Sequence, residues 1–436
     1  MSGVVLRIYS RLMRLAQPLL RRKMAKRVLQ EPVYGEAVEE RFGHYTQPCE
    51  TSSSLVWLHA VSLGETRTAA VLLKTLREQY PGLRLLLTHG TATGREEGRA
   101  LLQAGDVQVW QPWDTHEVVQ RFFEHFKPRL GLLMETEVWP CAVAAAKLRN
   151  IPIVLINGRL SEKSLQQAST LSLLAYPAYA ALTAIYAQTA ADAARYRQLG
   201  MEVKGVFGNL KFDAAPNADL LAIGKAWRKA MNQPVVMFAS SRQGEEALFL
   251  EQIIAETKQK QAQAAPEFIA IKWLIVPRHP QRFDEVAALV EQSGLTLSRR
   301  SSWSSSPHDN AEAMQAAVWL GDTLSEMPLY YGLSDVALLG GSFEKFGGQN
   351  LIEAAACGCP VVLGPHTFNF LEAADLAQEA GAAYRATDMA GAVSWTIQCV
   401  NDRDAQTRMS LAAVSFASTH QGATQRTVAA LQVYLC

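Results

Sequence analysis

The regular alternation of short apolar runs with helical segments is the feature that most constrains this chain. In the first half, runs of strand composition lie at residues 55–60, 83–88, 107–110, 130–134, 153–156, 184–187 and 203–207. The alternation begins again at residues 235–239 and continues through 273–276, 318–320 and 336–339. Strands that alternate with helices imply a parallel sheet covered by helices on both faces. The sequence therefore predicts an α/β fold made of two similar halves, with a hinge near residues 205–215.

The composition is that of a globular protein. A chain of 436 residues has room for two or three domains of roughly 150 residues each. Its apolar share of 49% and charged share of 19% allow sizeable cores, and its net charge of +1 argues against a general nucleic-acid binder. The six cysteines show no spacing typical of zinc sites or disulfide frameworks, which fits a reducing, cytoplasmic compartment.

The N-terminal segment combines basic charge with apolar periodicity. Its first 30 residues hold eight lysines and arginines and no acidic residue. Apolar residues recur at steps of three and four at Val4, Val5, Ile8, Leu12, Leu15 and Leu19. Arginines interrupt this pattern too often for a membrane span, and no signal-peptide cleavage site follows it. We expect an amphipathic helix on an anionic bilayer surface, broken near Pro18; a basic helix packed on the protein's own body remains the alternative.

A glycine-rich stretch, residues 340–353, follows the apolar run 336–339 and precedes three alanines that favour a helix. Glycines let the backbone approach a ligand, and the N-terminus of a helix favours a phosphate. Glu353 falls in the first turn of that helix, where its carboxylate could accept hydrogen bonds from ribose hydroxyls. The glycines alone could equally serve tight turns. Two Gly-Gly pairs and a carboxylate in one strand-to-helix loop favour a nucleotide site.

Three carboxylates follow strands in the first half. Glu65 begins a helix just after the first strand, where it is either a partner of the helix N-terminus or a general base. Glu135 and Glu137 follow the strand 130–134, at the edge where parallel sheets bind ligands. Solvated carboxylates are about as common at such positions, and the spacing of two residues leaves open whether both face the same way.

Arg278 and His279 lie between two prolines at a strand end in the second half. A guanidinium on a backbone fixed by prolines suits phosphate recognition, and a structural pair with a loop carboxylate is the alternative. The chain contains no Walker A, H-E-x-x-H or G-x-S-x-G motif. Phosphate charge would then be met by arginine, lysine and helix N-termini.

Several motifs together resemble those of the Kdo (3-deoxy-D-manno-octulosonic acid) transferases, which are GT-B glycosyltransferases. The matching stretches are residues 59–65 (HAVSLGE), 135–140 (ETEVWP), 157–161 (NGRLS), 208–213 (GNLKFD), 277–280 (PRHP), 340–342 (GGS), 350–353 (NLIE) and 364–370 (GPHTFNF). They occur in order over most of the chain from about residue 35 onward. Each is weak alone, and the set is highly specific.

The resemblance implies an inverting transfer of Kdo from CMP-Kdo to a tetraacylated lipid A precursor, lipid IVA, in lipopolysaccharide core assembly. It implies peripheral or monotopic attachment to the cytoplasmic face of the inner membrane, and neither a bound metal nor a cofactor nor a nucleic-acid partner. It also implies two Rossmann-like domains that face each other across a cleft. We accordingly expect a membrane-associating segment at residues 1–30, an acceptor-binding domain at 31–207 and a CMP-sugar-binding domain with terminal helices at 208–436.

The resemblance also implies roles for individual residues. Glu65 becomes the catalytic base that deprotonates the acceptor hydroxyl. Support on the acceptor side is assigned to Ser62, Gly64, Glu135 and Glu137. Binding of CMP is assigned to Arg278, His279, Gly340, Gly341, Ser342, Gly347, Gly348, Asn350 and Glu353.

The chain departs from the family pattern in the second half. Residues 347–350 read GGQN where the family commonly has GGHN, so Gln349 keeps hydrogen-bonding capacity and loses titratability. Residues 350–354 read NLIEA in place of Asn-Pro-Leu-Glu-Pro, and residues 324–326 read LSE in place of Met-Gly-Glu. The alternatives are another GT-B enzyme that uses a UDP-sugar donor, and a catalytically silent lipid-binding scaffold at the membrane surface.

Overall fold

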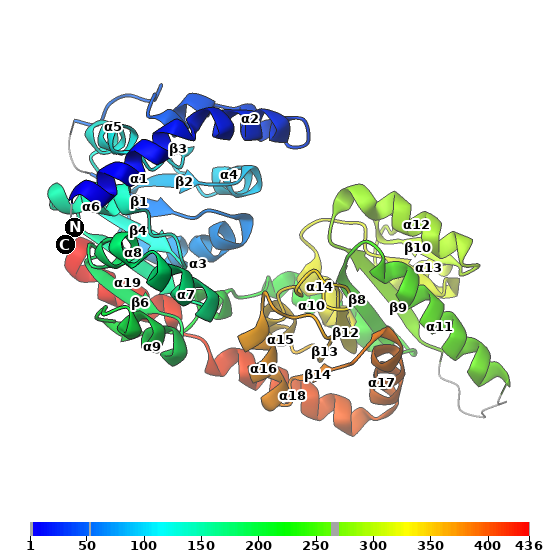
Figure 1. Cartoon of the computed structure of the whole chain (residues 1–436). Coiled ribbons are helices and arrows are strands. Elements are labelled where there is room, and N and C mark those ends of the chain that lie inside the picture. The colour runs from blue at the N-terminus through cyan, green and yellow to red at the C-terminus, as the bar shows by residue number, and fades with distance from the viewer. Residues whose placement is uncertain (1–2, 52–53, 263–269, 436) are drawn as a thin grey trace. The chain divides into compact units, whose positions relative to one another are not determined.

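The computed structural model describes residues 3–51, 54–262 and 270–435. The chain divides into two compact units, of which the first comprises Met1–Asp213 and Gln421–Cys436 and the second Ala214–His420 (Figure 1). Each unit contains one seven-stranded sheet in which all paired strands are parallel. The predicted α/β class with two similar halves is confirmed.

The sheet of the first unit has the strand order β3-β2-β1-β4-β5-β6-β7. Its strands are β1 (Leu55–His59), β2 (Arg84–His89), β3 (Val107–Trp110), β4 (Leu130–Met134), β5 (Ile153–Gly158), β6 (Ala184–Ala187) and β7 (Gly205–Val206). Its α-helices are α1 (Gly3–Leu15), α2 (Gln17–Val28), α3 (Leu63–Gln79), α4 (Ala92–Arg99), α5 (His116–Phe126), α6 (Pro140–Leu148), α7 (Glu162–Thr170), α8 (Ser172–Tyr179), α9 (Ala190–Gln198) and α19 (Ala423–Leu435), with 3-10 turns η1 (Pro32–Gly35), η2 (Val38–Phe42) and η3 (Leu210–Asp213). The order reverses between β1 and β4, which are neighbours, and ligands of such sheets bind at this switch point.

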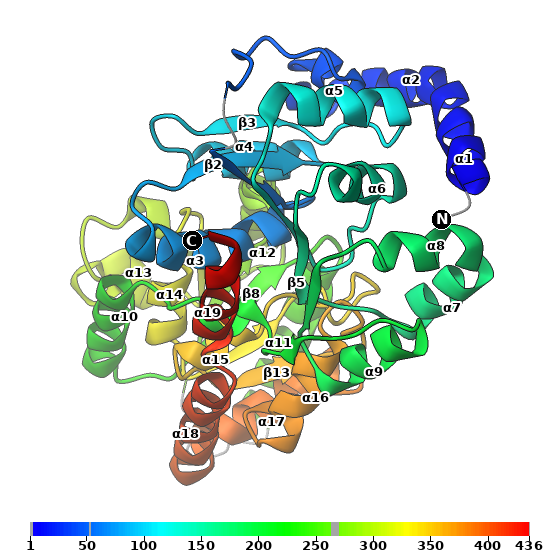
Figure 2. The same ribbon diagram turned by 90° about the vertical axis from the view of Figure 1, so that its left-hand side faces the viewer.

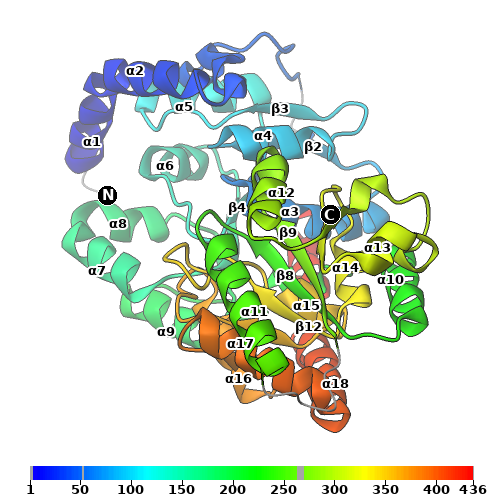
Figure 3. The same ribbon diagram turned by 90° about the vertical axis from the view of Figure 1, so that its right-hand side faces the viewer.

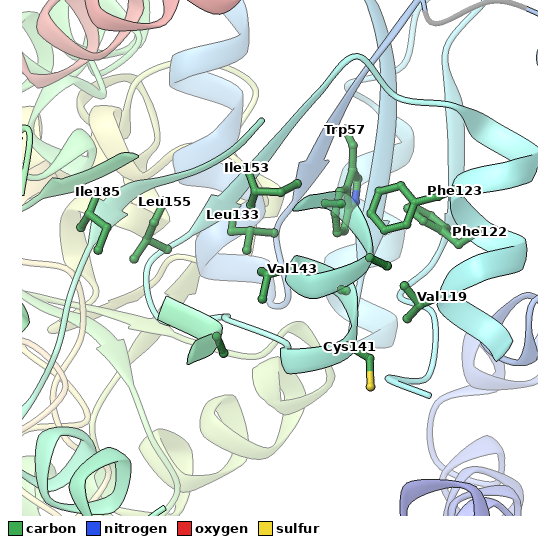
Figure 4. Close-up of a cluster of buried hydrophobic side chains, with 14 of the residues drawn as sticks. Trp57, Val119, Phe122, Phe123, Leu133, Cys141, Val143, Ile153, Leu155 and Ile185 are labelled. Carbon is green, nitrogen blue, oxygen red and sulfur yellow. The ribbon is translucent and has the colours of Figure 1, made fainter. Parts of the chain in front are cut away.

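Apolar side chains cover both faces of this sheet. Along β1, Leu55 and Trp57 belong to one buried cluster, and Val56 and Leu58 belong to the other. This alternation follows from the two-residue period of a strand. Figure 4 shows Trp57 with Phe122 and Phe123 of α5, and the rings of Trp57 and Phe122 meet edge to face at 5.1 Å between centroids. Because both faces are buried, the strands read as continuous apolar runs.

Helix α1 packs on the first unit through polar and aromatic contacts. The backbone N–H of His116 donates to Ser10 Oγ at 2.9 Å, and Trp113 Nε1 donates to the Met13 carbonyl at 2.7 Å. Figures 2 and 3 both show α1 beside α6 and α8. The helix ends at Leu15 and α2 begins at Gln17 with Pro18 in its first turn, so the predicted break is confirmed. None of the helices in the described ranges is both long and apolar enough to cross a bilayer.

The sheet of the second unit has the order β10-β11-β9-β8-β12-β13-β14. Its strands are β8 (Val235–Ser241), β9 (Lys272–Pro277), β10 (Leu297–Arg299), β11 (Val318–Leu320), β12 (Val336–Leu339), β13 (Val361–Leu363) and β14 (Ala383–Arg385). Its α-helices are α10 (Ala218–Ala230), α11 (Glu245–Ala262), α12 (Phe283–Gln292), α13 (Ala311–Gln315), α14 (Met327–Leu333), α15 (Ile352–Ala356), α16 (Leu371–Glu379), α17 (Met389–Asn401) and α18 (Arg403–Thr419), with 3-10 turns η4 (Pro280–Arg282), η5 (Arg300–Ser302) and η6 (Pro307–Asp309). The edge strands β10 and β14 were not expected, because their residues, Leu-Ser-Arg and Ala-Tyr-Arg, do not form an apolar run.

The C-terminal helix α19 returns to the first unit, so the second unit does not extend from residue 208 to 436 as the sequence suggested. Its side chains Val428 and Leu431 join the apolar cluster that also holds Leu72 and Leu76 of α3. The carboxylate of Asp213 accepts hydrogen bonds from the backbone N–H groups of Gly422 and Thr424, residues more than 200 positions away. Burial of the apolar face of α19 thus explains why the end of the chain belongs to the first unit.

Candidate active site

Glu65 lies in the first turn of α3, directly after β1. Ser62 caps this helix and accepts a hydrogen bond from the Glu65 N–H at 3.4 Å. In return, the Glu65 carboxylate accepts from the Val61 N–H at 2.8 Å and from Ser62 Oγ at 3.2 Å. This S-x-x-E arrangement is a capping box. Glu65 and Ser62 therefore have a structural role, whereas Gly64 is exposed beside them.

Burial raises the pKa of Glu65 to about 7, although the Val61 N–H opposes this, and the charges of Glu135 and Glu137 raise it further. A carboxylate with a pKa near the working pH is partly ionised and still basic enough to take a proton efficiently. The capping role and the role of a base do not exclude each other, since one oxygen can bond the backbone while the group titrates. The site thus holds a carboxylate suited to general base catalysis.

The strand order brings Glu135 and Glu137 close to Glu65, because β4 pairs with β1 in parallel and both strands end at the same edge of the sheet. Glu135 has a positive φ of 56°, and its backbone is fixed by an N–H bond to the Ile156 carbonyl at 3.1 Å. Burial raises the pKa of Glu137, and Glu135 raises it further. The structure therefore places all three predicted carboxylates within electrostatic range of each other, which the sequence spacing left open.

Lys211 completes this group and was not assigned a role from the sequence. Its Nζ lies 3.0 Å from Glu135 Oε1, and the side chains are only 24% and 14% exposed. Asn157, at a positive φ of 51°, fixes the lysine segment because its Oδ1 accepts from the Leu210 N–H at 3.0 Å. Lys211 lies in the GNLKFD stretch, residues 208–213. Its place in a motif shared with the family is the sequence signal that could have identified it.

The glycine-rich stretch of the second unit contains positions that require glycine. Gly341, Gly347 and Gly348 have φ values of 71°, 92° and 82°, which side-chain-bearing residues rarely adopt. At Gly340 a Cβ atom would stand 2.4 Å from the Ser240 carbonyl oxygen, so β8 and β12 could not approach as closely. The tight-turn interpretation therefore holds at these glycines, and assignment of CMP to them stays a prediction.

The amide groups at the start of this stretch already bind an anion of the protein itself. The buried carboxylate of Glu245 accepts hydrogen bonds from the N–H groups of Gly341 at 2.7 Å, Phe343 at 3.0 Å and Glu344 at 3.1 Å. A fourth comes from the Arg242 N–H at 2.9 Å. Ser342 does not bind Glu245 through its side chain. Its Oγ accepts from the Gly364 N–H at 2.8 Å and so links the glycine-rich stretch to the end of β13.

Cationic side chains gather at the ends of β8 and β9. Burial lowers the pKa of His279, and the charges of Arg242, Arg278 and Arg282 lower it further, so the four groups are close. Arg282 is held by Glu246 and Glu285. Arg242, which the sequence analysis did not single out, packs its guanidinium 4.7 Å from the centre of the Phe346 ring and has no ion pair within the described ranges. Arg242 and Arg278 are thus candidate ligands for a phosphate.

Glu353 and Asn350 lie at the start of α15, which is only five residues long. Asn350 Oδ1 accepts from the Ile352 N–H at 3.1 Å in the turn that leads into this helix. Glu353 approaches the buried Tyr331, whose pKa is raised by burial and then by Glu353, while Arg278 opposes the rise. The predicted ribose ligand and the predicted phosphate ligand therefore lie near the same tyrosine. Within the described residues, no three His, Cys, Asp or Glu side chains are grouped so as to hold a metal ion.

Solved structures with the same architecture define the fold class. A glycosyltransferase from Rickettsia africae matches with a TM-score of 0.56 and 12% identity over 88% of this chain and 99% of that one. MurG from Acinetobacter baumannii matches with a TM-score of 0.54 and 14% identity over 87% and 99%. A UDP-N-acetylglucosamine 2-epimerase from Neisseria meningitidis matches with a TM-score of 0.55 and 15% identity over 86% and 99%, so these likenesses show the GT-B fold and leave the reaction open.

Sequence comparison gives the family. A family model described as 3-Deoxy-D-manno-octulosonic-acid transferase (kdotransferase) matches residues 36–214. The transferase of that name from Bordetella pertussis is 46% identical over 87% of each chain, and the one from Haemophilus influenzae is 31% identical over 98% of each. The chain belongs to the Kdo transferase family and is a glycosyltransferase of lipopolysaccharide biosynthesis.

Proposed function

We propose that this enzyme transfers Kdo from CMP-Kdo to lipid IVA, a tetraacylated lipid A precursor, with inversion at the anomeric carbon. The observation that carries the proposal is the Glu65 carboxylate, whose pKa of about 7 suits a base, at the switch point of the first sheet. The relatives of this enzyme from Bordetella pertussis and Haemophilus influenzae are named 3-deoxy-D-manno-octulosonic acid transferases. Their names support Kdo as the sugar that is transferred.

Glu65 takes the proton from the acceptor hydroxyl as the oxygen attacks the anomeric carbon of Kdo. Glu135 and Glu137 raise the basicity of Glu65, and Lys211 compensates part of their charge. The ammonium group of Lys211 also offers N–H donors to an acceptor sugar or its phosphate. The group that leaves is CMP, on whose phosphate negative charge grows.

The second unit binds the donor. Arg242 and Arg278 meet the phosphate of CMP-Kdo, and Glu353 accepts hydrogen bonds from the ribose hydroxyls. Cations fixed near the leaving phosphate stabilise the transition state more than the ground state, because the negative charge there increases as the bond breaks. Arg242 is the best placed of these residues, since its backbone is fixed by Glu245 and its guanidinium by Phe346.

The exposed face of α1 supports action at the cytoplasmic face of the inner membrane. Tyr9 and Ser10 face the body of the first unit, whereas Leu12 and Leu15 are 61% and 76% exposed. The other large apolar side chains exposed on the N-terminal helices and just after them are Val4, Ile8, Leu19 and Leu29. All eight basic residues of these helices are exposed as well, among them Arg11, Arg22, Lys23 and Lys26. Such a surface binds anionic lipid by burial of leucines and by charge.

Turnover of defined substrates tests the proposal. The purified enzyme is incubated with lipid IVA and either CMP-Kdo or UDP-N-acetylglucosamine, and the lipid product is analysed by mass spectrometry. We expect Kdo to be added from CMP-Kdo only, and the product mass gives the number of Kdo units. Transfer from the UDP-sugar would support another GT-B activity, and absence of transfer from both donors would support the lipid-binding scaffold.

A further inference from the structure

Two buried carboxylates begin α11, and they have different partners. Glu246 pairs with both nitrogens of the Arg282 guanidinium at 2.7 and 3.1 Å and accepts from Ser241 Oγ at 2.8 Å. Glu245 has no cationic side chain within salt-bridge distance in the described ranges, and its carboxylate is fully buried. Its partners are four backbone N–H groups instead. Glu246 therefore fixes the Arg282 side chain, whereas Glu245 fixes backbone N–H groups of two loops.

The four N–H groups come from two loops that are far apart in the sequence. One belongs to Arg242, just before α11, and the other three belong to Gly341, Phe343 and Glu344 after β12. These loops meet because β8 and β12 are neighbours at the switch point of the second sheet. Successive N–H groups that converge on one point form a nest for an anion. Here the anion is the carboxylate of Glu245.

We propose that Glu245 is a positioning residue of the donor site, which holds the glycine-rich loop and Arg242 in the arrangement that receives the sugar nucleotide. This inference rests on the proposed function, which places the donor at that loop. It also means that the N–H groups of Gly341, Phe343 and Glu344 serve the internal carboxylate, and that the donor phosphate is bound by side-chain cations. Glu245 itself does not touch the donor.

Glu245 can hold the loop because four N–H donors depend on its single carboxylate. Hydrogen bonds from N–H groups to an ionised acceptor are stronger than neutral ones, and a buried donor without a partner is costly. Without the carboxylate, the two buried N–H groups of Gly341 and Phe343 and the two partly buried ones of Arg242 and Glu344 would need new partners. The loop would then rearrange around Gly341 and Gly348, whose conformations are accessible mainly to glycine. A loop that shifts also displaces Phe346, against which Arg242 packs.

Chemical rescue tests this role. Glu245→Ala removes the carboxylate and leaves space for formate or acetate, either of which can accept the same N–H groups. We expect the KM for CMP-Kdo to rise roughly tenfold or more, the equivalent of about one lost charge-assisted hydrogen bond, with a smaller change in kcat. Added formate should lower the KM again. Glu246→Gln is the matched control, since it removes a second buried charge from the same helix turn and should give no response to formate.

A second measurement does not depend on the identity of the donor. Hydrogen exchange at the amides of Gly341, Phe343 and Glu344 should accelerate in Glu245→Ala and slow again with formate. If parent enzyme shows no transfer from CMP-Kdo while this exchange pattern is found, the proposed function fails and Glu245 still holds the loop. If Glu245→Ala does not fold, Glu245→Gln is used, which keeps one acceptor oxygen and should raise KM without rescue. A parental KM in either folded variant, or a raised KM in Glu245→Ala that formate leaves unchanged, overturns the proposal.

Discussion

At the scale of single residues, Glu65 combines a helix cap with a candidate base, and its environment connects the two roles. The capping box fixes the carboxylate in place, and burial together with Glu135 and Glu137 raises its pKa to about 7. A carboxyl group with a raised pKa stabilises the fold at low pH, and this contribution is lost as pH rises from its ordinary value of 4.5 through about 7. The ionised form, which the proposed base must adopt, is therefore the one that burial in the folded enzyme disfavours.

The pH dependence of activity reports this residue. We expect kcat/KM to rise with pH through an apparent pKa near 7, because the base must be ionised. Glu135→Gln should move this limb to lower pH, since a negative neighbour is removed and Lys211 is released from its ion pair. Initial rates between pH 5 and 9 measure it, and a limb at the same pH in both enzymes would contradict the assignment.

Two variants of Glu65 separate its roles. Glu65→Gln keeps an oxygen for the Val61 N–H and removes the buried charge, so its thermal stability at pH 8 should equal or exceed that of the parent. Its activity should fall by about 10²–10⁴, the usual contribution of a general base. Glu65→Ala also loses the cap and should be less stable by about 1 kcal/mol. Kdo transfer near the parental rate in a folded Glu65→Gln enzyme would show that another group is the base.

Lys211 offers a further test at this scale. Lys211→Met leaves Glu135 unpaired in a site where it is 14% exposed, and its charge then acts on Glu65 without compensation. The acid limb of kcat/KM should shift to higher pH, and the rate at neutral pH should drop. Lys211→Arg keeps the charge and serves as the control. A limb that does not move in Lys211→Met would show that the lysine acts on substrate alone.

At the scale of elements, α1 packs on the first unit and also exposes apolar side chains, so binding to a membrane surface stays a prediction. Leu6, Tyr9 and Ser10 contact the first unit, whereas Leu12 and Leu15 stay exposed. A helix that merely completed the body would bury its leucines. The exposed face is therefore available to a surface outside the chain, and its basic neighbours favour an anionic one.

Vesicle binding tests the role of α1. Leu12→Glu with Leu15→Glu should abolish sedimentation with phosphatidylglycerol vesicles, because each leucine contributes about 1.5–3 kcal/mol on burial and the new charges repel the lipid. Val433→Glu is the matched control, since Val433 is 74% exposed on α19 and lies away from α1 in sequence. Equal binding by the two variants would exclude α1 as the membrane element.

At the scale of the whole molecule, the chain passes from the first unit to the second after Asp213 and returns after His420. The return is fixed by the Asp213 carboxylate and by the apolar face of α19, whose Leu431 is fully buried. Leu431→Ala should lower the free energy of unfolding by about 2–5 kcal/mol, as for other buried leucines. Thermal or urea denaturation measures this, with Leu411→Ala, which is 66% exposed on α18, as the control. Equal loss in both variants would show that α19 contributes little to the first unit.

The sequence by itself determined the elements and the chemistry that they carry. Apolar runs of three to six residues could be placed as strands because both faces of a parallel sheet are buried. The Ser62 to Glu65 spacing, Pro18 and the glycines at 341, 347 and 348 act locally, through caps and backbone conformations, so local sequence is enough to place them. The edge strands β10 and β14 could not be found this way, because each ends in an arginine and contains no apolar run.

Only the tertiary structure decided which of these residues meet. Strand order is set by how whole helices and strands pack, and it joins β1 to β4 and β8 to β12, segments about 75 and 100 residues apart. Those two neighbour relations bring Glu135 to Glu65 and the glycine-rich loop to Glu245. The Lys211 ion pair and the return of α19 depend on the same long-range packing. The sequence therefore specified candidate acids, bases and loops, and burial between distant elements gave Glu65 its basicity and Glu245 its partners.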